Sequence, residues 1–147
     1  MLQIRIKINN SEYMNDIKDF LNEGDRFAAT NGMQLTEVRE GYARAEMTVE
    51  ARHLNAAGVC QGGAYFTLAD LAFAAVTNYQ GIITLGIQNS ITFLQSAHEG
   101  DTLIAEAEVT FNHHRLPFCE MRVTNQQGEL ICIVTGSAYR TKKELKK

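Results

Sequence analysis

The first part of the chain changes from a strand-like to a helix-like pattern of apolar positions. Residues 2–8 alternate apolar with polar side chains, which is typical of a strand with one buried face. Ser11 then fits the N-cap of a helix, whose apolar side consists of Met14, Ile17, Phe20 and Leu21. Gly24 interrupts this helix, a second helical stretch starts at Asp25, and Gly32 suits the left-handed position after its last turn.

A long apolar helix and a series of strands follow. Residues 33–40 and 42–50 alternate on either side of Gly41, which predicts a hairpin. From about residue 64 to residue 78 every face is apolar, so this segment predicts a helix buried on most sides. Further strands are expected at residues 82–94, 101–113, 117–125 and 130–140. A helix wrapped by five to six mainly antiparallel strands is an α+β architecture, and residues 1–147 form one expected domain.

Composition and charge narrow the class of protein. Apolar residues make up 45% and charged residues 21%, as in an ordinary globular domain. The net charge of −3 argues against nucleic acid as a partner, and no apolar run is long enough for a membrane span or a signal peptide. Three cysteines without a CxxC pair predict neither a disulfide framework nor a zinc ribbon, which favours a cytoplasmic location. The basic tail at residues 141–147 is expected to fray.

One carboxylate stands out in the expected central helix. Between His53 and His98, Asp70 is the only Asp, Glu, Lys or Arg. A lone carboxylate buried in so apolar a run costs several kcal/mol or shifts its pKa strongly. Asp70 is therefore a candidate for chemistry, and a hydrogen bond to a helix cap or to Thr67 is the structural alternative.

The start of this helix offers a second candidate group. A helix that begins at Gly62–Gly63 leaves backbone N–H groups unpaired, and these suit a developing oxyanion, although two glycines also fit a tight turn. A phosphate-binding loop is a poor match, because no GK[ST] follows. Asp70 lies eight positions after Gly62, roughly 12 Å along a helix that rises about 1.5 Å per residue. One substrate carbonyl cannot contact both groups in one subunit, so shared chemistry requires a dimer.

Few other polar residues lie near these positions in the sequence. Asn55 and Gln61 either orient a carbonyl or a water molecule, or satisfy backbone groups of the loop before the helix. His53 is expected to bond within the same loop. Cys60 precedes a helix start, which favours a thiolate, but no partner base is evident. The pair His113–His114 is expected in a strand, with side chains on opposite faces and no joint metal site.

With these residues in place, the chain resembles the hotdog-fold acyl-CoA thioesterases of the phenylacetate-degradation (PaaI-like) type. The likeness covers about residues 25–140, with residues 1–24 as an N-terminal extension, and its most specific piece runs from Asn55 through the glycine pair to Asp70. The resemblance implies a homodimer, often paired again into a tetramer, and no cofactor or metal. It also implies that the Gly62 N–H polarises the thioester carbonyl and that Asp70 of the opposing subunit attacks or activates water. Asn55 is then expected near that carbonyl or water.

Two positions depart from the family pattern. Gln61 stands where the family usually has a histidine, so a proton-transfer role is absent at this position and an orienting role survives. In the related eukaryotic branch a serine early in the next strand places the water. Gly86 occupies the corresponding position here, and Thr84 and Ser90 are close enough to leave the alignment open.

The leading hypothesis is hydrolysis of an acyl- or aroyl-CoA thioester. A non-catalytic dimer that binds or senses acyl-CoA is the alternative, and a hotdog hydratase or dehydratase ranks last. The candidates for contact with the acyl group are Gly63, Tyr65, Phe66, Phe73 and Phe93. The candidates for the phosphates of coenzyme A are Arg52, Arg115 and Arg140. The connection at residues 113–118 is expected to shape substrate access.

Overall fold

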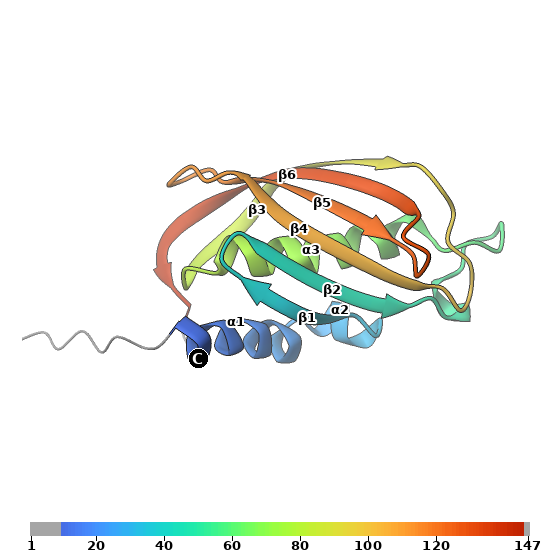
Figure 1. Cartoon of the computed structure of the whole chain (residues 1–147), viewed down its shortest axis with the longest axis horizontal. Helices are drawn as coiled ribbons and strands as arrows, with labels where there is room; N and C mark the ends of the chain where they lie inside the picture. The colour runs from blue at the N-terminus through green and yellow to red at the C-terminus, as the bar shows by residue number, and fades with distance from the viewer. Residues whose placement is uncertain (1–9, 146–147) are drawn as a thin grey trace, which may run out of the picture.

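In the computed structural model, six antiparallel strands curve around one central helix (Figure 1). The structure describes residues 10–145, with side chains from residue 17 onward, so the strand predicted at residues 2–8 lies outside the described residues. The helices are α1 (Asn10–Gly24), α2 (Arg26–Thr30), the short 3-10 helix η1 (Ala51–His53) and α3 (Gly62–Asn78). The strands are β1 (Gln34–Arg39), β2 (Tyr42–Thr48), β3 (Ile82–Phe93), β4 (Thr102–Phe111), β5 (Phe118–Thr124) and β6 (Leu130–Glu144). The α+β prediction is confirmed.

The core lies between α3 and the concave face of the sheet. The strand order is β1-β2-β4-β5-β6-β3, and α3 contacts all six strands. Leu68, Leu71 and Phe73 of α3 are buried, together with alternate residues of the central strands. Because the sheet surrounds α3, the helix is apolar on most of its faces, as predicted. None of the helices between residues 10 and 145 is long and apolar enough to cross a membrane.

Helix α1 covers one edge of the sheet, and the short helix α2 after it lies against α1 and α3. Asn22 of α1 exchanges two hydrogen bonds with the backbone of Leu35 in the edge strand β1, at 2.8 and 3.1 Å. Asp25 caps α2 by accepting the Ala28 N–H, as the interruption at Gly24 predicts. Ser11 is not the N-cap of α1, since the helix already includes Asn10. Helix ends are the least certain feature of a sequence pattern, because a cap depends on one side chain.

The opposite edge of the sheet, along β3, is open. Leu85 and Ile87 are 60% and 57% exposed there, and β3 pairs only with β6 among the described strands. A long, apolar, unpaired edge strand is a template for pairing with a second chain. The two edges therefore differ, because helix α1 covers β1, whereas no helix within residues 10–145 pairs along the edge of β3. The β3 backbone does receive one side chain near its start, since Asn78 exchanges two hydrogen bonds with Thr84, at 2.8 and 3.0 Å.

Two predictions at the far end of the sheet are corrected. The tail at 141–147 is not frayed as a whole, because residues up to Glu144 continue β6 by pairing with Ile82. The pair His113–His114 is in the loop between β4 and β5 rather than in a strand, and the two rings lie 4.4 Å apart. The strict alternation of a strand does not apply in a loop, so the two side chains are able to pack together.

Candidate active site

The first turn of α3 presents one backbone donor without an acceptor. Gln61 is the N-cap, and its side-chain oxygen accepts the Gly63 N–H. The Ala64 N–H donates to the Gln61 carbonyl at 2.9 Å. Among residues 10–145, the Gly62 N–H has no hydrogen-bond acceptor. The predicted oxyanion donor is therefore available at Gly62, while the N–H of Gly63 is already used.

An aromatic ring lies directly against Gly62. A Cβ atom added at Gly62 would lie 2.8 Å from two ring atoms of Phe93, so only glycine fits while this ring stays in place. Phe93 is 55% exposed, and its ring centroid lies 6.3 Å from that of Tyr65. Phe93 thus forms one wall beside the free N–H, and its contact with the acyl group stays a prediction.

The other aromatic candidates divide between core and pocket. Tyr65 is buried, and its hydroxyl accepts the Ala97 N–H at 2.8 Å, so its oxygen already has a structural partner. Phe73 is also buried and contacts the Cα side of Gly86. Phe66 is partly buried and lines a pocket beside α3. Of these three, Phe66 is the one that the structure leaves facing open space.

Asp70 is exposed in the single chain, although its neighbours in the sequence are almost all apolar. It lies on the face of α3 that the sheet does not cover, and within the described part of the chain its carboxylate accepts no hydrogen bond. Thr67 bonds to the Gly63 carbonyl at 2.8 Å, so it is not the partner of Asp70. Desolvation by the surrounding protein, and then the charge of Asp25, raise the pKa of Asp70 above its ordinary value.

The side chain of Asn55 uses its oxygen in hydrogen bonds to the loop and leaves its nitrogen without a partner in the described part of the chain. Its Oδ1 accepts the N–H groups of Ala57 and Val59, at 2.9 and 3.3 Å, which is the loop role considered from the sequence. This fixes the orientation of the amide, so that Nδ2 is left as a donor without a partner among residues 10–145. The exposed Asn55 is therefore compatible with both of its predicted roles.

Cys60 precedes α3 but does not have the surroundings of a nucleophile. Its side chain is buried, and burial raises the pKa of the Cys60 thiol to about 11. We expect the Cys60→Ala variant to keep its catalytic rate within about threefold of the wild type, because a neutral thiol contributes packing and no charge. Thiol release under saturating substrate measures this. A loss approaching that of a catalytic variant would show that Cys60 takes part in the reaction.

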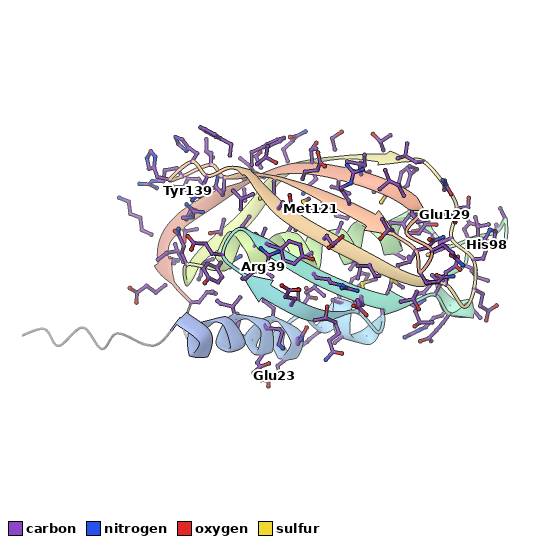
Figure 2. The ribbon with its side chains drawn as sticks, viewed as in Figure 1. Glu23, Arg39, His98, Met121, Glu129 and Tyr139 are labelled. Carbon is purple, nitrogen blue, oxygen red and sulfur yellow. The ribbon has the colours of Figure 1, made fainter. Side chains whose placement is uncertain are left out.

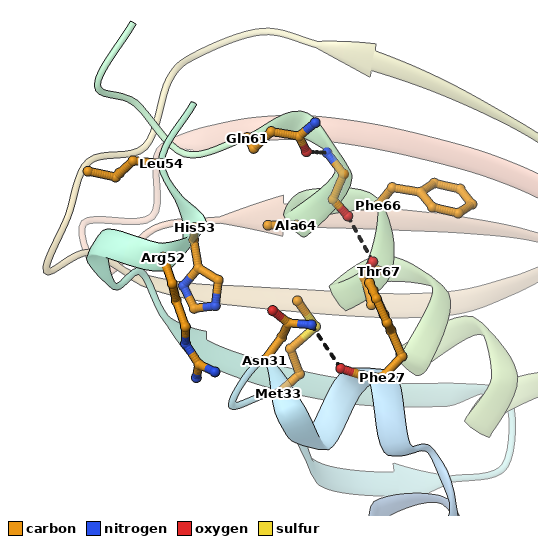
Figure 3. Close-up of a pocket in the computed structure, with 11 residues that line it drawn as sticks. Phe27, Asn31, Met33, Arg52, His53, Leu54, Gln61, Ala64, Phe66 and Thr67 are labelled. Carbon is orange, nitrogen blue, oxygen red and sulfur yellow. Dashed lines mark hydrogen bonds between the residues drawn. The ribbon is translucent and has the colours of Figure 1, made fainter. Parts of the chain in front are cut away.

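A pocket of about 390 Å³ opens between α2, η1 and the first turns of α3 (Figure 3). The residues that line it are Phe27, Asn31, Met33, Arg52, His53, Leu54, Gln61, Gly63, Ala64, Phe66 and Thr67. Gln61 and Gly63 connect this pocket to the free N–H of Gly62. The contributions of α2 were not predicted from the sequence. No sequence pattern marks Phe27 as a pocket residue, and its 68% exposed apolar side chain becomes apparent only in the structure.

The predicted cations lie at two ends of the molecule. Arg52 lines the pocket, and its guanidinium bonds to Glu50 and to the Thr30 carbonyl. Arg115 bonds to the Tyr139 hydroxyl at 3.0 Å, and Arg140 donates to the His113 carbonyl at 3.2 Å. Figure 2 shows Tyr139 and His98 at opposite ends of the molecule. His98 marks the end where α3 begins, because the adjacent Ala97 donates its N–H to Tyr65 in the first turns of α3. Within one chain, Arg115 and Arg140 are therefore remote from Gly62.

No group of three or more His, Cys, Asp or Glu side chains within residues 10–145 is arranged to hold a metal ion. His113 and His114 lie together, but His113 Nδ1 already accepts the N–H groups of Arg115 and Leu116. The polar groups around α3 are a backbone N–H, a carboxylate and two amides, which suit acyl transfer to water.

Comparison with known proteins agrees with this chemistry. The family described as the thioesterase superfamily matches residues 57–132. The acyl-coenzyme A thioesterase PaaI of Escherichia coli is 35% identical over 118 residues, which cover 80% of this chain and 84% of that protein. Human acyl-coenzyme A thioesterase 13 is 30% identical over 100 residues, 66% of this chain and 71% of that protein.

The fold comparison points in the same direction. The structure of the Escherichia coli PaaI protein from the phenylacetic acid degradation operon superposes with a TM-score of 0.89 and 30% sequence identity. The match covers 94% of this chain and all of that one. The chain therefore belongs to the thioesterase superfamily, as a PaaI-like hotdog-fold thioester hydrolase.

Proposed function

We propose that this protein hydrolyses acyl-CoA thioesters at a site shared between two subunits. The observation that carries the proposal is the free Gly62 N–H at the start of α3, with an exposed carboxylate two turns further along the same helix. Both groups suit thioester hydrolysis, but they are too far apart along α3 to act on one carbonyl from one chain. Coenzyme A as the thiol is supported by the two relatives, which are named acyl-coenzyme A thioesterases.

Gly62 is assigned to the carbonyl oxygen of the substrate. Its N–H points out of the helix start, where the partial positive charge of the helix favours a developing oxyanion. Phe93 limits the access of water on one side, and a drier surrounding strengthens the hydrogen bond in the transition state. Asn55 Nδ2 is assigned to the same oxygen or to the attacking water, and Gln61 holds the first turn by accepting the Gly63 N–H.

Asp70 of the partner is assigned to the attack on the carbonyl carbon. A carboxylate with a raised pKa is a better base and a better nucleophile than a fully hydrated one, so both routes remain open. As a base it removes a proton from water, which then attacks, and the thiol leaves with a proton. As a nucleophile it forms a mixed anhydride that water cleaves in a second step. The reaction requires only water as a co-reactant.

The open edge of β3 supports the arrangement of the dimer. Antiparallel pairing of β3 with the same strand of a second chain brings the Phe93 end of one strand toward the Gly86 end of the other. Gly62 packs against Phe93, and Phe73 packs against Gly86, one turn beyond Asp70. The same pairing therefore moves the Gly62 of one chain toward the Asp70 of the other. It also brings the end with Arg115 toward that site, where coenzyme A phosphates need cations. A dimer of dimers stays a prediction.

A charge placed in this edge tests the shared site. We expect Ile87→Lys to give a folded monomer with at least tenfold lower thiol release, because a lysine in an edge strand opposes pairing. Sedimentation and thiol release from short, medium, long and aromatic acyl-CoAs measure the two effects. Thr36→Lys adds the same charge at an exposed position of the other edge strand, β1, and should change neither.

Two results would contradict the proposal in different ways. A monomeric Ile87→Lys variant with full activity would show that one chain holds a complete site. A wild-type protein that binds acyl-CoAs but releases thiol from none of them would favour the acyl-CoA-binding alternative. Gln61→His would then be the first substitution to test for a gain of hydrolysis.

A further inference from the structure

His53 presents a buried donor without a partner in the wall of the pocket between α2, η1 and α3. The residue is 5% exposed, and its Nε2 atom has no hydrogen-bond partner within residues 10–145. Its Nδ1 atom accepts the Glu50 N–H at 2.9 Å, which ties the ring to η1. Since Nδ1 is an acceptor, the neutral ring carries its hydrogen on Nε2. The ring thus offers one N–H donor in a fixed direction.

This donor is close to the proposed reaction centre. The His53 carbonyl accepts the Gln61 N–H at 2.8 Å, so the residue lies beside the N-cap of α3. In Figure 3 the His53 ring lies between Arg52 and the pocket, with Met33 and Asn31 across from it. Most of the remaining lining is apolar, from Phe27, Met33 and Phe66 among others. Because Nε2 is buried, a bound molecule reaches it only when a neighbouring side chain moves. Met33, which lies across from the ring, is unbranched and adaptable enough to do so.

The size and position of the pocket suit the acyl part of a thioester. Its volume of about 390 Å³ lies near the lower end of small-molecule sites. Gln61 and Gly63 belong to both the pocket and the first turn of α3, so a carbonyl at the Gly62 N–H has its acyl group directed between α2 and α3. A buried N–H that binds nothing is costly, which favours a ligand that supplies an acceptor.

We propose that this pocket holds the acyl group and that His53 Nε2 donates a hydrogen bond to an oxygen on it, such as a ketone, ether or hydroxyl oxygen. The inference rests on the proposed function and narrows the substrate class to acyl groups with an internal acceptor. An all-hydrocarbon acyl group leaves Nε2 unpaired when it displaces water from the pocket, and a site built around a polar group discriminates strongly against such analogues.

Two substitutions separate the donor from the structural role of the ring. His53→Asn keeps an acceptor near the position of Nδ1 for the Glu50 N–H and removes the Nε2 donor. His53→Gln extends an amide N–H toward the position of Nε2 and loses the acceptor for Glu50. A purely structural histidine would tolerate the first change better than the second, whereas a recognition role requires the opposite.

The substrates are matched pairs of acyl-CoAs. One member of each pair has a ketone at a given position of the acyl chain, and the other has a methylene group at that position. The readout is the ratio of kcat/KM within a pair. We expect the wild type to favour at least one oxo-acyl-CoA, His53→Asn to lower this ratio about 5- to 100-fold, and His53→Gln to keep most of it. Equal ratios in all three proteins would overturn the inference, even if all of them hydrolyse acyl-CoA.

Binding provides the same comparison without turnover. Dissociation constants for the same pairs, measured by calorimetry in an Asp70→Asn background, should show the same loss of preference in His53→Asn. If the wild type hydrolyses none of the acyl-CoAs but the binding preference follows His53, the proposed reaction fails and the pocket assignment stands. If no pair differs in affinity, the pocket assignment fails whatever the activity.

Discussion

Asp70→Asn is expected to lower thiol release from acyl-CoA by about 100-fold or more, because asparagine neither attacks a carbonyl nor removes a proton from water. The change is nearly isosteric, and Asp70 is exposed in the single chain without a hydrogen bond among the described residues. The variant should therefore fold and bind substrate as the wild type does. Steady-state kinetics should show the loss in kcat, and a loss confined to KM would indicate a binding role instead.

The dependence of this activity on pH follows from the raised pKa of Asp70. The carboxylate acts in its ionised form, so the rate falls as the pH drops through this pKa, at a pH above that of an ordinary aspartate. Asp25 contributes to the shift through its charge. Asp25→Asn keeps a residue able to cap α2 and removes the charge. In a profile of kcat against pH, the fall in rate on the acidic side should therefore move to lower pH. If the acidic side of the profile does not move, the group that titrates there is not Asp70.

The thermal stability of Asp70→Asn shows whether a loss of activity in this variant reflects catalysis or a folding defect. Because the folded state raises the pKa of Asp70, protonation of this group favours folding. Its contribution is present below the unfolded pKa and is lost as the pH rises through the folded pKa. At neutral pH the neutral amide of Asp70→Asn should therefore leave the Tm unchanged or slightly higher. A lower Tm would mean that the carboxylate has a stabilising partner.

The sequence was most informative where one local pattern decides the structure. Period-two alternation placed the hairpin around Gly41, and a fully apolar run between Gly62–Gly63 and Gly81 placed α3, because both patterns reflect burial by a single large core. The spacing of Gly62 and Asp70 on α3 was predictable for the same reason, since helix geometry fixes the distance between them.

The pocket was not predictable, because it joins segments that are far apart in the chain. Phe27 and Met33 reach it from α2 and the turn after it, whereas His53 comes from η1. No local pattern shows that Asn22 ties α1 to β1 and so closes the edge of the sheet. The exposure of Asp70 in the single chain was not predictable for a related reason, since an apolar sequence window does not reveal which helix face the sheet leaves uncovered.

Gly62→Pro is expected to lower kcat about 10²- to 10³-fold relative to Gly62→Ala, because proline removes the one free N–H of the helix start. Proline suits the first helical position, and Gln61 before it has the extended conformation that proline requires, at φ −68° and ψ 136°. Alanine is the matched control, since its Cβ meets the Phe93 ring as proline's does but its N–H remains. Equal kinetics for the two variants would exclude the N–H from the reaction.

Combining the two inactive chains decides whether the site is shared. In a heterodimer of Asp70→Asn with Gly62→Pro, one site has Gly62 from the first chain and Asp70 from the second, and is intact. The other site lacks both groups. Random pairing of equal amounts gives about half heterodimers, so co-expression should restore about one quarter of the wild-type rate. If Gly62 and Asp70 of the same chain acted together, every site would lack one group and mixing would restore nothing. Recovery of activity from two inactive proteins therefore requires a site that combines Gly62 of one chain with Asp70 of the other, and the monomeric Ile87→Lys variant then tests whether β3 forms that interface.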